Sequence, residues 1–423
     1  RSIQSGINFS SGGDSVTVAA GTYVENVSLN KTIVLMSSEG AESTIIDANN
    51  FGTVVTITDG SDATLDGFIL QNGYTSGSNT KSGGLIVLNN DAVVKNCIIK
   101  NNQGHQGGGI YSQAGSFYNC QIIGNTAEFT GGGVEVNQIG GNSEYQLFEN
   151  CLIANNHCGT GAGIYGWCRL VNTSVVNNTG GYGMASAGTS TITNSIIYGN
   201  DGDEIGSFTA TVTYSLVEGG YTGTGNIDAD PLLADTANGD YSLSDYSPCI
   251  GAGTATGAPT TDLNGNNRIQ GGSNPDMGAY ENSRPSQRPK AGAIADGTSN
   301  DLGQTDIDWH NSSSTIPANW ANFVDNGNIA TLVHEFAIGS STSNLADVLT
   351  WTTVSVDTGA GPSYTATGLS LTEGSTYYVS VRATDTDSQV SDTTTSDGVT
   401  IDVTNPAISS VVEGSAASTN YSL

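Results

Sequence analysis

The chain of 423 residues has little positive charge: 11 Lys and Arg stand against 40 Asp and Glu, a formal net charge of −29. Nucleic-acid backbones are bound through clustered Lys and Arg, so this balance argues against a nucleic-acid partner and against an anionic membrane surface. Cysteine is also scarce, and six residues over this length do not make a disulfide scaffold. No apolar run reaches about 18 residues, so we expect no membrane insertion.

Glycine is the residue in excess, with 57 copies, about twice the usual share. It has no three-residue period, which excludes collagen. Since 36% of the residues are hydrophobic and only 12% are charged, the chain can form a core and is not a charged disordered polymer. Low lysine, high acidity and abundant Thr, Ser and Asn favour an extracellular or cell-surface location, as in a protein secreted by a bacterium. The length allows two to four domains.

A repeat of about 22 residues runs through the first half of the chain. Short β-rich blocks carry an Asn at one fixed position, and these Asn residues are 23, 31, 22 and 22 residues apart. A second Asn follows six residues after each. The first Asn column consists of Asn96, Asn119, Asn150, Asn172 and Asn194, and the second of Asn102, Asn125, Asn156, Asn178 and Asn200.

This period predicts a solenoid in which each coil holds about three short strands. A leucine-rich repeat has a similar length, but its Leu pattern and helix are missing. Coils of a parallel β-helix stack about 4.8 Å apart, so equivalent residues form columns. Asn suits such a column because its amide can hydrogen-bond from coil to coil and it tolerates a left-handed corner.

The cysteines fall at two kinds of position. Cys97, Cys120 and Cys151 each follow a first-column Asn, and side-chain alternation predicts that they point inward as buried thiols. A disulfide between neighbouring coils is the alternative, whereas stacked residues do not converge tetrahedrally on a metal. Cys158 and Cys168 flank a Gly-rich turn, ten residues apart, and are the better candidates for a disulfide.

The N-terminus fits a capped solenoid, because an amphipathic run over residues 2–9 precedes the first β-rich segment at 16–27. On these motifs, residues 1–225 resemble the pectate-lyase-like superfamily of right-handed parallel β-helices. The resemblance implies a fold but no single activity. Members include lyases, glycoside hydrolases, esterases, phage tailspikes, adhesins and coils without known catalysis.

Catalysis would need a constellation that the coils do not show. The resemblance implies Asp-rich calcium sites with an Arg or Lys base in lyases, and clustered Asp in hydrolases. Residues 92–200, where the groove would lie, contain no Asp, and their Glu residues are scattered. We therefore expect no catalytic residue, and a polysaccharide lyase or glycoside hydrolase is the alternative.

An outward column could instead bind glycans. Aromatic faces beside amides and carboxylates suit sugar rings, which they stack on and hydrogen-bond. Ordinary β-surface residues, or residues shielded by the insertion before Asn150, are the other interpretation. The candidate glycan-binding residues are Tyr111, Gln113, Glu135, Asn137, Tyr165 and Trp167.

Residues 226–283 carry a different pattern, which includes the series 262–268 and 275–281. They resemble the choice-of-anchor segment of bacterial surface β-helix proteins, which implies a C-terminal cap. A cap should cover the last coil, because an open end invites edge pairing. Asp262, Asn264 and Asn266 alternate as in a calcium loop, but the downstream Glu of an EF-hand is missing. A turn held by Asx hydrogen bonds is the alternative, and no other cofactor is expected.

The C-terminal third reads as sandwich modules. Residues 284–291 form a linker with two prolines and three positive charges. Residues 292–403 resemble a fibronectin type III-like or Ig-like domain, in which Tyr377 would be the tyrosine corner and Trp309 the core. Residues 404–423 begin another module or form a strand exchanged with a second molecule.

The predicted fold class is therefore all-β, with a right-handed parallel β-helix (solenoid) followed by a β-sandwich. Sparse catalytic chemistry and modular architecture favour a secreted or cell-surface structural or adhesive protein. Its partners would be itself, through residues 404–423 in an extracellular fibre or sheath, or surface glycans. A carbohydrate-active enzyme or a non-catalytic glycan-binding module is the alternative function.

Overall fold

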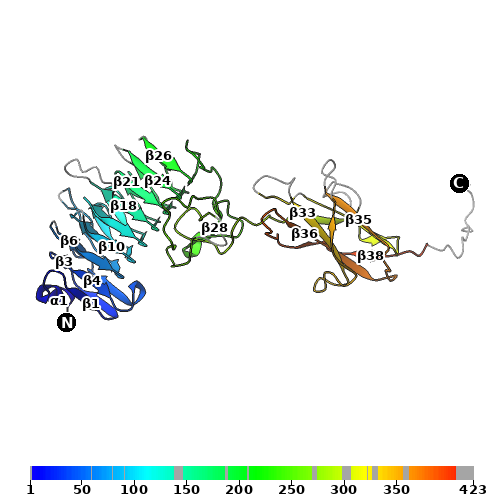
Figure 1. Ribbon diagram of the computed structural model, residues 1–423, viewed down its shortest axis with the longest axis horizontal. Coiled ribbons are helices and arrows are strands. Elements are labelled where there is room, and N and C mark those ends of the chain that lie inside the picture. The colour runs from blue at the N-terminus through cyan, green and yellow to red at the C-terminus, as the bar shows by residue number, and fades with distance from the viewer. Residues whose placement is uncertain are drawn as a thin grey trace, which may run out of the picture. The chain divides into compact units, whose positions relative to one another are not determined.

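The computed structural model describes residues 2–58, 60–78, 80–89, 91–137, 146–185, 189–206, 209–268, 274–297, 306–321, 323–325, 332–355 and 362–405. The chain divides into two compact units, residues 1–287 and 288–423. The predicted fold class is confirmed: the chain is almost entirely β, with a parallel β-helix followed by separate antiparallel sheets (Figure 1). No helix in the described part is long and apolar enough to cross a membrane.

Three parallel sheets run along the first unit. They come from strands that recur once per coil, so that each strand pairs with its equivalents in the coils before and after it. The first sheet contains β1 (Ser15–Val18), β4 (Val34–Ser37), β7 (Thr64–Asp66), β10 (Val93–Lys95), β14 (Ser116–Tyr118), β18 (Gln146–Glu149), β21 (Cys168–Val171), β24 (Ser190–Thr193) and β26 (Ala210–Thr213).

The second and third sheets follow the same rule. The second contains β2 (Gly21–Val24), β5 (Thr44–Asp47), β8 (Ile69–Gln71), β11 (Ile98–Lys100), β15 (Gln121–Ile123), β19 (Leu152–Ala154), β22 (Ser174–Val176), β25 (Ile196–Tyr198) and β27 (Leu216–Val217). The third contains β3 (Val27–Leu29), β6 (Val55–Ile57), β9 (Leu85–Val87), β13 (Ile110–Ser112), β17 (Val134–Val136), β20 (Ile164–Tyr165) and β23 (Met184–Ala185). A parallel pair, β12 (Gln103–Gln106) and β16 (Thr126–Thr130), lies outside these sheets.

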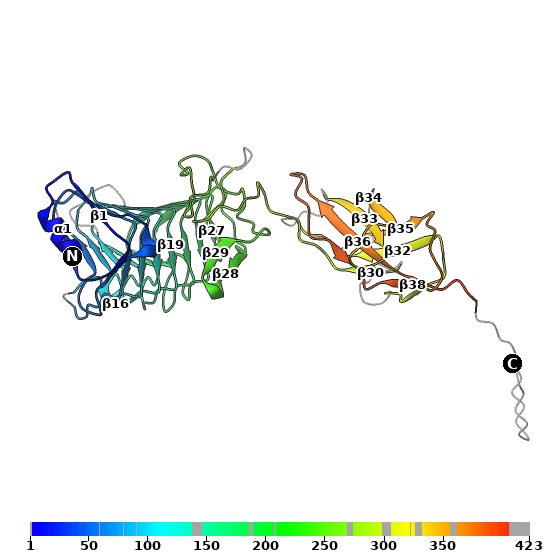
Figure 2. The ribbon, with the colours of Figure 1, turned by 90° about the horizontal axis from the view of Figure 1, so that it is seen from below.

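The helix α1 (Ile3–Phe9) closes the N-terminal end of the coils, as Figure 2 shows. The Ser2 side chain caps it by accepting from the Ser5 amide, and Ile3 and Ile7 join the core of the β-helix. The Glu25 carboxylate accepts the amides of Ile3 and Gln4 at 2.6 and 3.0 Å, where the helix dipole favours a negative charge.

The interior is built from aligned columns. Ile99 pairs with Ile122, which pairs with Ile153, and all three are buried. Phe117 and Phe148 stack with their ring centroids 4.6 Å apart. Register of this kind keeps these inward strand positions apolar from coil to coil.

All six cysteines are buried free thiols, so the predicted Cys158–Cys168 disulfide is wrong. Cys168 starts β21 and packs inside the coil as part of the main core. Cys158 lies before the Gly-rich turn, where its sulfur accepts the Thr160 amide at 3.5 Å. Cys168 therefore belongs to the main core and Cys158 to the turn, although the two residues are only ten apart in the sequence. Burial raises the pKa of the Cys168 thiol to about 12, which makes it unreactive.

The corners use Asn in two ways. Residues of the first Asn column adopt φ values of 46–53°, the left-handed conformation expected of corner Asn. In the second column the left-handed residue is the one before the Asn, for example Asn155 with φ 55° and Gly124 with φ 65°. The second-column Asn side chains are thereby turned into the interior, where all five are buried.

The last coil is closed by residues 215–227, of which only the last two belong to the predicted cap. Val217 donates to Ile227, whose own amide donates to Ser215, and Tyr221 packs against the core. The cap segment instead lies along the outer side of the second sheet. A separate core joins Leu152, Ala154, Val176, Ile196 and Leu216 of the coils to Tyr241, Leu243, Cys249, Ile250 and Met277 of the cap. The cap also contains the antiparallel pair β28 (Leu233–Asp235) and β29 (Asp240–Leu243).

The second unit is a set of antiparallel strands around its own core. One sheet contains β30 (Ile294–Asp296), β32 (Thr315–Trp320) and β35 (Ser363–Thr367). The other contains β31 (Trp309–His310), β38 (Val399–Ile401), β36 (Thr376–Thr384), β33 (Val333–Gly339) and β34 (Leu349–Val354), with β37 (Thr394–Thr395) beside β36. Among its described strand pairs, β31 and β38 are parallel and the others antiparallel.

Trp309 is not the core tryptophan of this unit, since 63% of it is exposed. Trp320, on β32, is buried and belongs to the core. Trp309 sits on a two-residue strand at the edge of its sheet, where one face remains open to solvent. Tyr377 is buried, and its hydroxyl accepts the Thr372 amide at 3.0 Å, the backbone contact a tyrosine corner makes.

Candidate functional site

The predicted glycan-binding column is aligned but largely covered. Tyr111 pairs with Glu135, which pairs with Tyr165, on β13, β17 and β20. Tyr111 is 1% exposed and Glu135 3%, whereas Tyr165 is partly exposed and Trp167 is 38% exposed. Gln113 and Asn137 are also partly exposed. The structure therefore leaves Tyr165 and Trp167 as the accessible aromatic residues of the six.

Loops of the coils themselves cover the first part of the column. The Lys81 ammonium lies over the Tyr111 ring, 4.4 Å from its centroid, and also donates to Gln106 of β12 at 3.1 Å. Gly107 approaches so closely that an added Cβ would lie 3.0 Å from the Cβ of Glu135. A side chain at that position would collide, so glycine is required for this cover.

Glu135 is the one acid of the column, and its environment shifts the pKa of its carboxyl group toward neutral pH. Burial raises its pKa to about 7, against the opposing effects of Thr130 and the Lys81 charge. Its Oε2 has no hydrogen-bond partner among the described residues. A carboxyl group with such a pKa suits general acid catalysis, but a substrate must reach it. At 3% exposure it is closed off.

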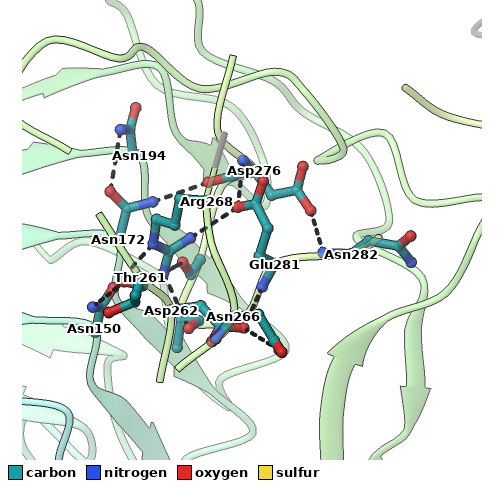
Figure 3. Close-up of polar contacts among 12 residues, drawn as sticks. Asn150, Asn172, Asn194, Thr261, Asp262, Asn266, Arg268, Asp276, Glu281 and Asn282 are labelled. Atoms are coloured by element: carbon teal, nitrogen blue, oxygen red, sulfur yellow. Dashed lines mark hydrogen bonds and ion pairs between the residues drawn. The ribbon is translucent and has the colours of Figure 1, made fainter. Parts of the chain in front are cut away.

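The most elaborate polar cluster lies where the cap meets the coils. Arg268 is completely buried, and Figure 3 shows its guanidinium between Asn150 of the first Asn column and Glu281 of the cap. It donates to the Asn150 Oδ1 at 2.7 and 3.1 Å, to the carbonyls of Gly278 and Ala279 at 3.0 Å, and to the Glu281 Oε2 at 3.3 Å. One side chain thus ties three parts of the chain together.

Three carboxyl groups of the cap surround this arginine. Asp276 accepts the amides of Gly251 and Asn282, and Glu281 accepts the amide of Asp276. Burial raises the pKa of Asp276 to about 7 and that of Glu281 to about 8, so both hold protons more tightly than they would in water. Burial also lowers the pKa of Arg268.

The third acid, Asp262, belongs to the loop that the sequence offered as a calcium site. Its Oδ1 accepts the amides of Asn264 and Asn266 at 2.9 and 2.7 Å, and its Oδ2 accepts the Asn266 side chain and the Glu281 amide at 3.1 and 2.9 Å. All of these partners are N–H donors, so both oxygens are already engaged within the protein. The geometry is that of an Asx turn rather than of a cation loop.

The cap also joins the first Asn column directly. The Asn150 side chain donates through its Nδ2 to the Asn119 Oδ1 at 3.1 Å and to the Thr261 carbonyl at 2.7 Å. The Asn172 Nδ2 donates to the Asp276 carbonyl at 3.0 Å. Asn194 exchanges two hydrogen bonds of 2.8 Å with Thr254. The corner residues of these coils therefore serve as the attachment points of the cap.

Sequence reasoning noted the motifs of the cap but missed Arg268, Asp276 and Glu281 as a cluster. The concentration of polar residues in the series 262–268 and 275–281 is the feature of the sequence that could have indicated this cluster. What the cluster can do is hold the cap, since its donors and acceptors are satisfied internally. A comparison of the chain with models of protein families finds no match, and neither does a comparison with curated proteins.

Proposed function

We propose that the chain is a secreted or cell-surface structural protein that displays a rigid β-helix together with a β-sandwich module, as an adhesive or supporting element. The observation that carries this proposal is that the buried polar side chains of the first unit hydrogen-bond within the chain. The Asn columns and the Arg268 cluster connect the chain to itself, and Glu135 is buried beneath it. A buried polar network of this kind rigidifies a fold.

The resemblances of the sequence support the extracellular setting. The coils resemble the pectate-lyase-like superfamily, the cap resembles choice-of-anchor segments of bacterial surface proteins, and the second unit resembles fibronectin type III-like domains. Assembly into a fibre or sheath is part of the proposal and depends on residues 404–423. Of these, all but 404 and 405 lie outside the described residues, so the assembly step is supported by the sequence alone.

Two observations on the same material test the proposal. Gold-labelled antibodies against the chain should label intact, unpermeabilised cells that produce it, and the purified chain should release no product from a panel of acidic and neutral polysaccharides, with or without calcium. Labelling only after permeabilisation contradicts the surface location.

Product release would favour the alternative, a carbohydrate-active enzyme. In that case Glu135→Gln should abolish release, because Glu135 is the acid of the column with a pKa of about 7. Glu128→Gln is the matched control, since Glu128 is an exposed Glu on the neighbouring β16 and its pKa is lowered by the His105 hydrogen bond.

A further inference from the structure

The second unit brings together three acidic residues that are far apart in the sequence. Asp296 ends β30, Asp306 precedes β31, and Asp397 lies in the turn before β38. Each contributes one carboxylate oxygen, and the three oxygens lie within 4.8 Å of one another.

Asp296 differs from the other two acids of the cluster because it is buried. The residue is completely buried, and neither of its carboxylate oxygens makes a hydrogen bond of normal geometry with a described residue, although the Ser396 side chain and the Gly398 amide lie close enough to lower its pKa. A buried carboxylate without donors is strongly unfavourable, so an unsatisfied one in a folded protein needs an explanation. Its oxygen faces the two other carboxylates, which are both exposed and bring further negative charge.

The backbone holds the three residues in place. The Asp296 amide donates to the Asp306 Oδ1 at 3.2 Å, and the Ile307 amide donates to the Asp296 carbonyl at 3.0 Å. Next to Asp397, Ser396 exchanges hydrogen bonds with the backbone of Val379 at 2.9 and 3.0 Å. The arrangement is therefore fixed by secondary structure, not by an attraction between the acids.

The electrostatic environment of Asp296 also favours a bound cation. Burial is the main cause that raises the pKa of Asp296 to about 7, and the charges of Asp306 and Asp397 add to it, while Ser396 and the Gly398 amide oppose it. Among the described residues, the main causes that act on the pKa of Asp296 include no Lys or Arg. The cluster thus brings three acidic groups together, and a bound cation would neutralise their charge.

We propose that Asp296, Asp306 and Asp397 form a divalent-cation site of the second unit, and that calcium is the ion it binds. Carboxylate oxygens are hard ligands and suit calcium rather than zinc or copper. Oxygens up to 4.8 Å apart can share one ion, since calcium–oxygen distances are about 2.3–2.6 Å. The exposed Asp306 and Asp397 leave room for water to complete the coordination.

The site connects β30 and the segment before β38, which are the first and last strands among the described residues of the unit. Calcium would thus stabilise this module by binding the folded state alone. This role is separate from the proposed structural function and from the Asp262 loop of the first unit.

Calorimetry on the full chain tests the site. After removal of metal with a chelator, calcium should raise the unfolding temperature of one transition by several degrees, and titration should show saturable binding. Asp296→Asn should remove both effects, and without calcium it should unfold at or above the temperature of the original chain, because a neutral amide relieves the buried charge. Asp347→Asn is the matched control, an exposed Asp of the same unit that accepts from Ser340, and it should respond to calcium like the original chain.

Asp306→Asn is a second test that does not alter a buried residue, since Asp306 is exposed. It should weaken calcium binding at least tenfold with the fold unchanged. Magnesium at the same concentration should shift the transition less than calcium does. The proposal is overturned if calcium leaves the original chain unchanged, or if Asp296→Asn responds as strongly as the original chain does.

Discussion

At the scale of single residues, the cap depends on Arg268. Five hydrogen bonds leave its guanidinium, and they reach a coil residue, two cap carbonyls and a cap carboxyl group. A buried arginine stabilises only when its partners are all in place, since removing one member of a buried pair leaves the others unsatisfied. Here Asn150 and the Gly278 carbonyl would lose their donor, while the Ala279 carbonyl and Glu281 would each lose one of two donors.

Arg268→Met should therefore lower the free energy of unfolding of the first unit by about 3–5 kcal/mol. Methionine keeps much of the volume but donates no hydrogen bond. Urea denaturation followed by circular dichroism measures the loss. Arg169→Met, at an exposed position of β21, is the control and should change stability by no more than about 0.5 kcal/mol. Equal losses in the two variants would show that the cluster does not hold the cap.

At the scale of elements, the second Asn column is a continuous line of hydrogen bonds across five coils. Each amide donates to the Oδ1 of the next Asn, at 3.1, 3.0, 2.9 and 2.8 Å along the column. The backbone amide of each Asn donates to the same oxygen. At the end of the column Glu204 replaces the next Asn and accepts both donors of Asn200. A buried corner is thereby satisfied in every coil.

Removing one member should damage two coils at once. In Asn156→Ala the amide and the side chain of Asn125 lose their acceptor while they remain buried, so we expect a loss of about 2–4 kcal/mol in unfolding free energy. Thermal and urea unfolding measure it.

Asn119→Gly is the control for this prediction. It keeps the left-handed φ of 51° and removes a more exposed amide of the first column, with an expected loss below about 1 kcal/mol. If both variants lose the same stability, burial of the second column is not what makes its hydrogen bonds important.

At the scale of the whole molecule, the negative charge is not simply spread over the surface. Four acids of the first unit, Glu135, Glu204, Asp276 and Glu281, are buried, and burial raises their pKa values to about 7, 8, 7 and 8. The folded first unit therefore binds protons that the unfolded chain has already released at neutral pH.

This sets the direction of the pH dependence. The unfolded pKa values are about 4, so the contribution of these groups to stability is complete below pH 4 and is lost as the pH rises toward 8. We expect the unfolding temperature of the first unit to be higher at pH 5.5 than at pH 8.5. Glu135→Gln should reduce the difference and Glu128→Gln should not, because the pKa of Glu128 is lowered and its titration falls below this range. A higher unfolding temperature at pH 8.5 would contradict the prediction.

The sequence by itself determined the parallel β-helix, because stacking places equivalent residues of each coil together, and a column of Asn or Ile is visible as a period. It also indicated the sandwich and the tyrosine of its corner, since both depend on short local patterns. Burial depends on what packs over a strand from elsewhere in the chain. The sequence therefore predicted an exposed Tyr111 and a core Trp309, while the structure covers the first with Lys81 and leaves the second on an edge strand.

Only the tertiary structure decided the contacts between distant segments. The cap lies along the side of the coils because Leu152, Ile196 and Leu216 point outward there and need cover, although in the sequence their column looks mixed. Asp296 and Asp397 are a hundred residues apart and meet because β30 and β38 belong to one fold. A repeat determines its own neighbours through its period, whereas a cap, a salt bridge or an acidic cluster is determined by the path of the chain in three dimensions.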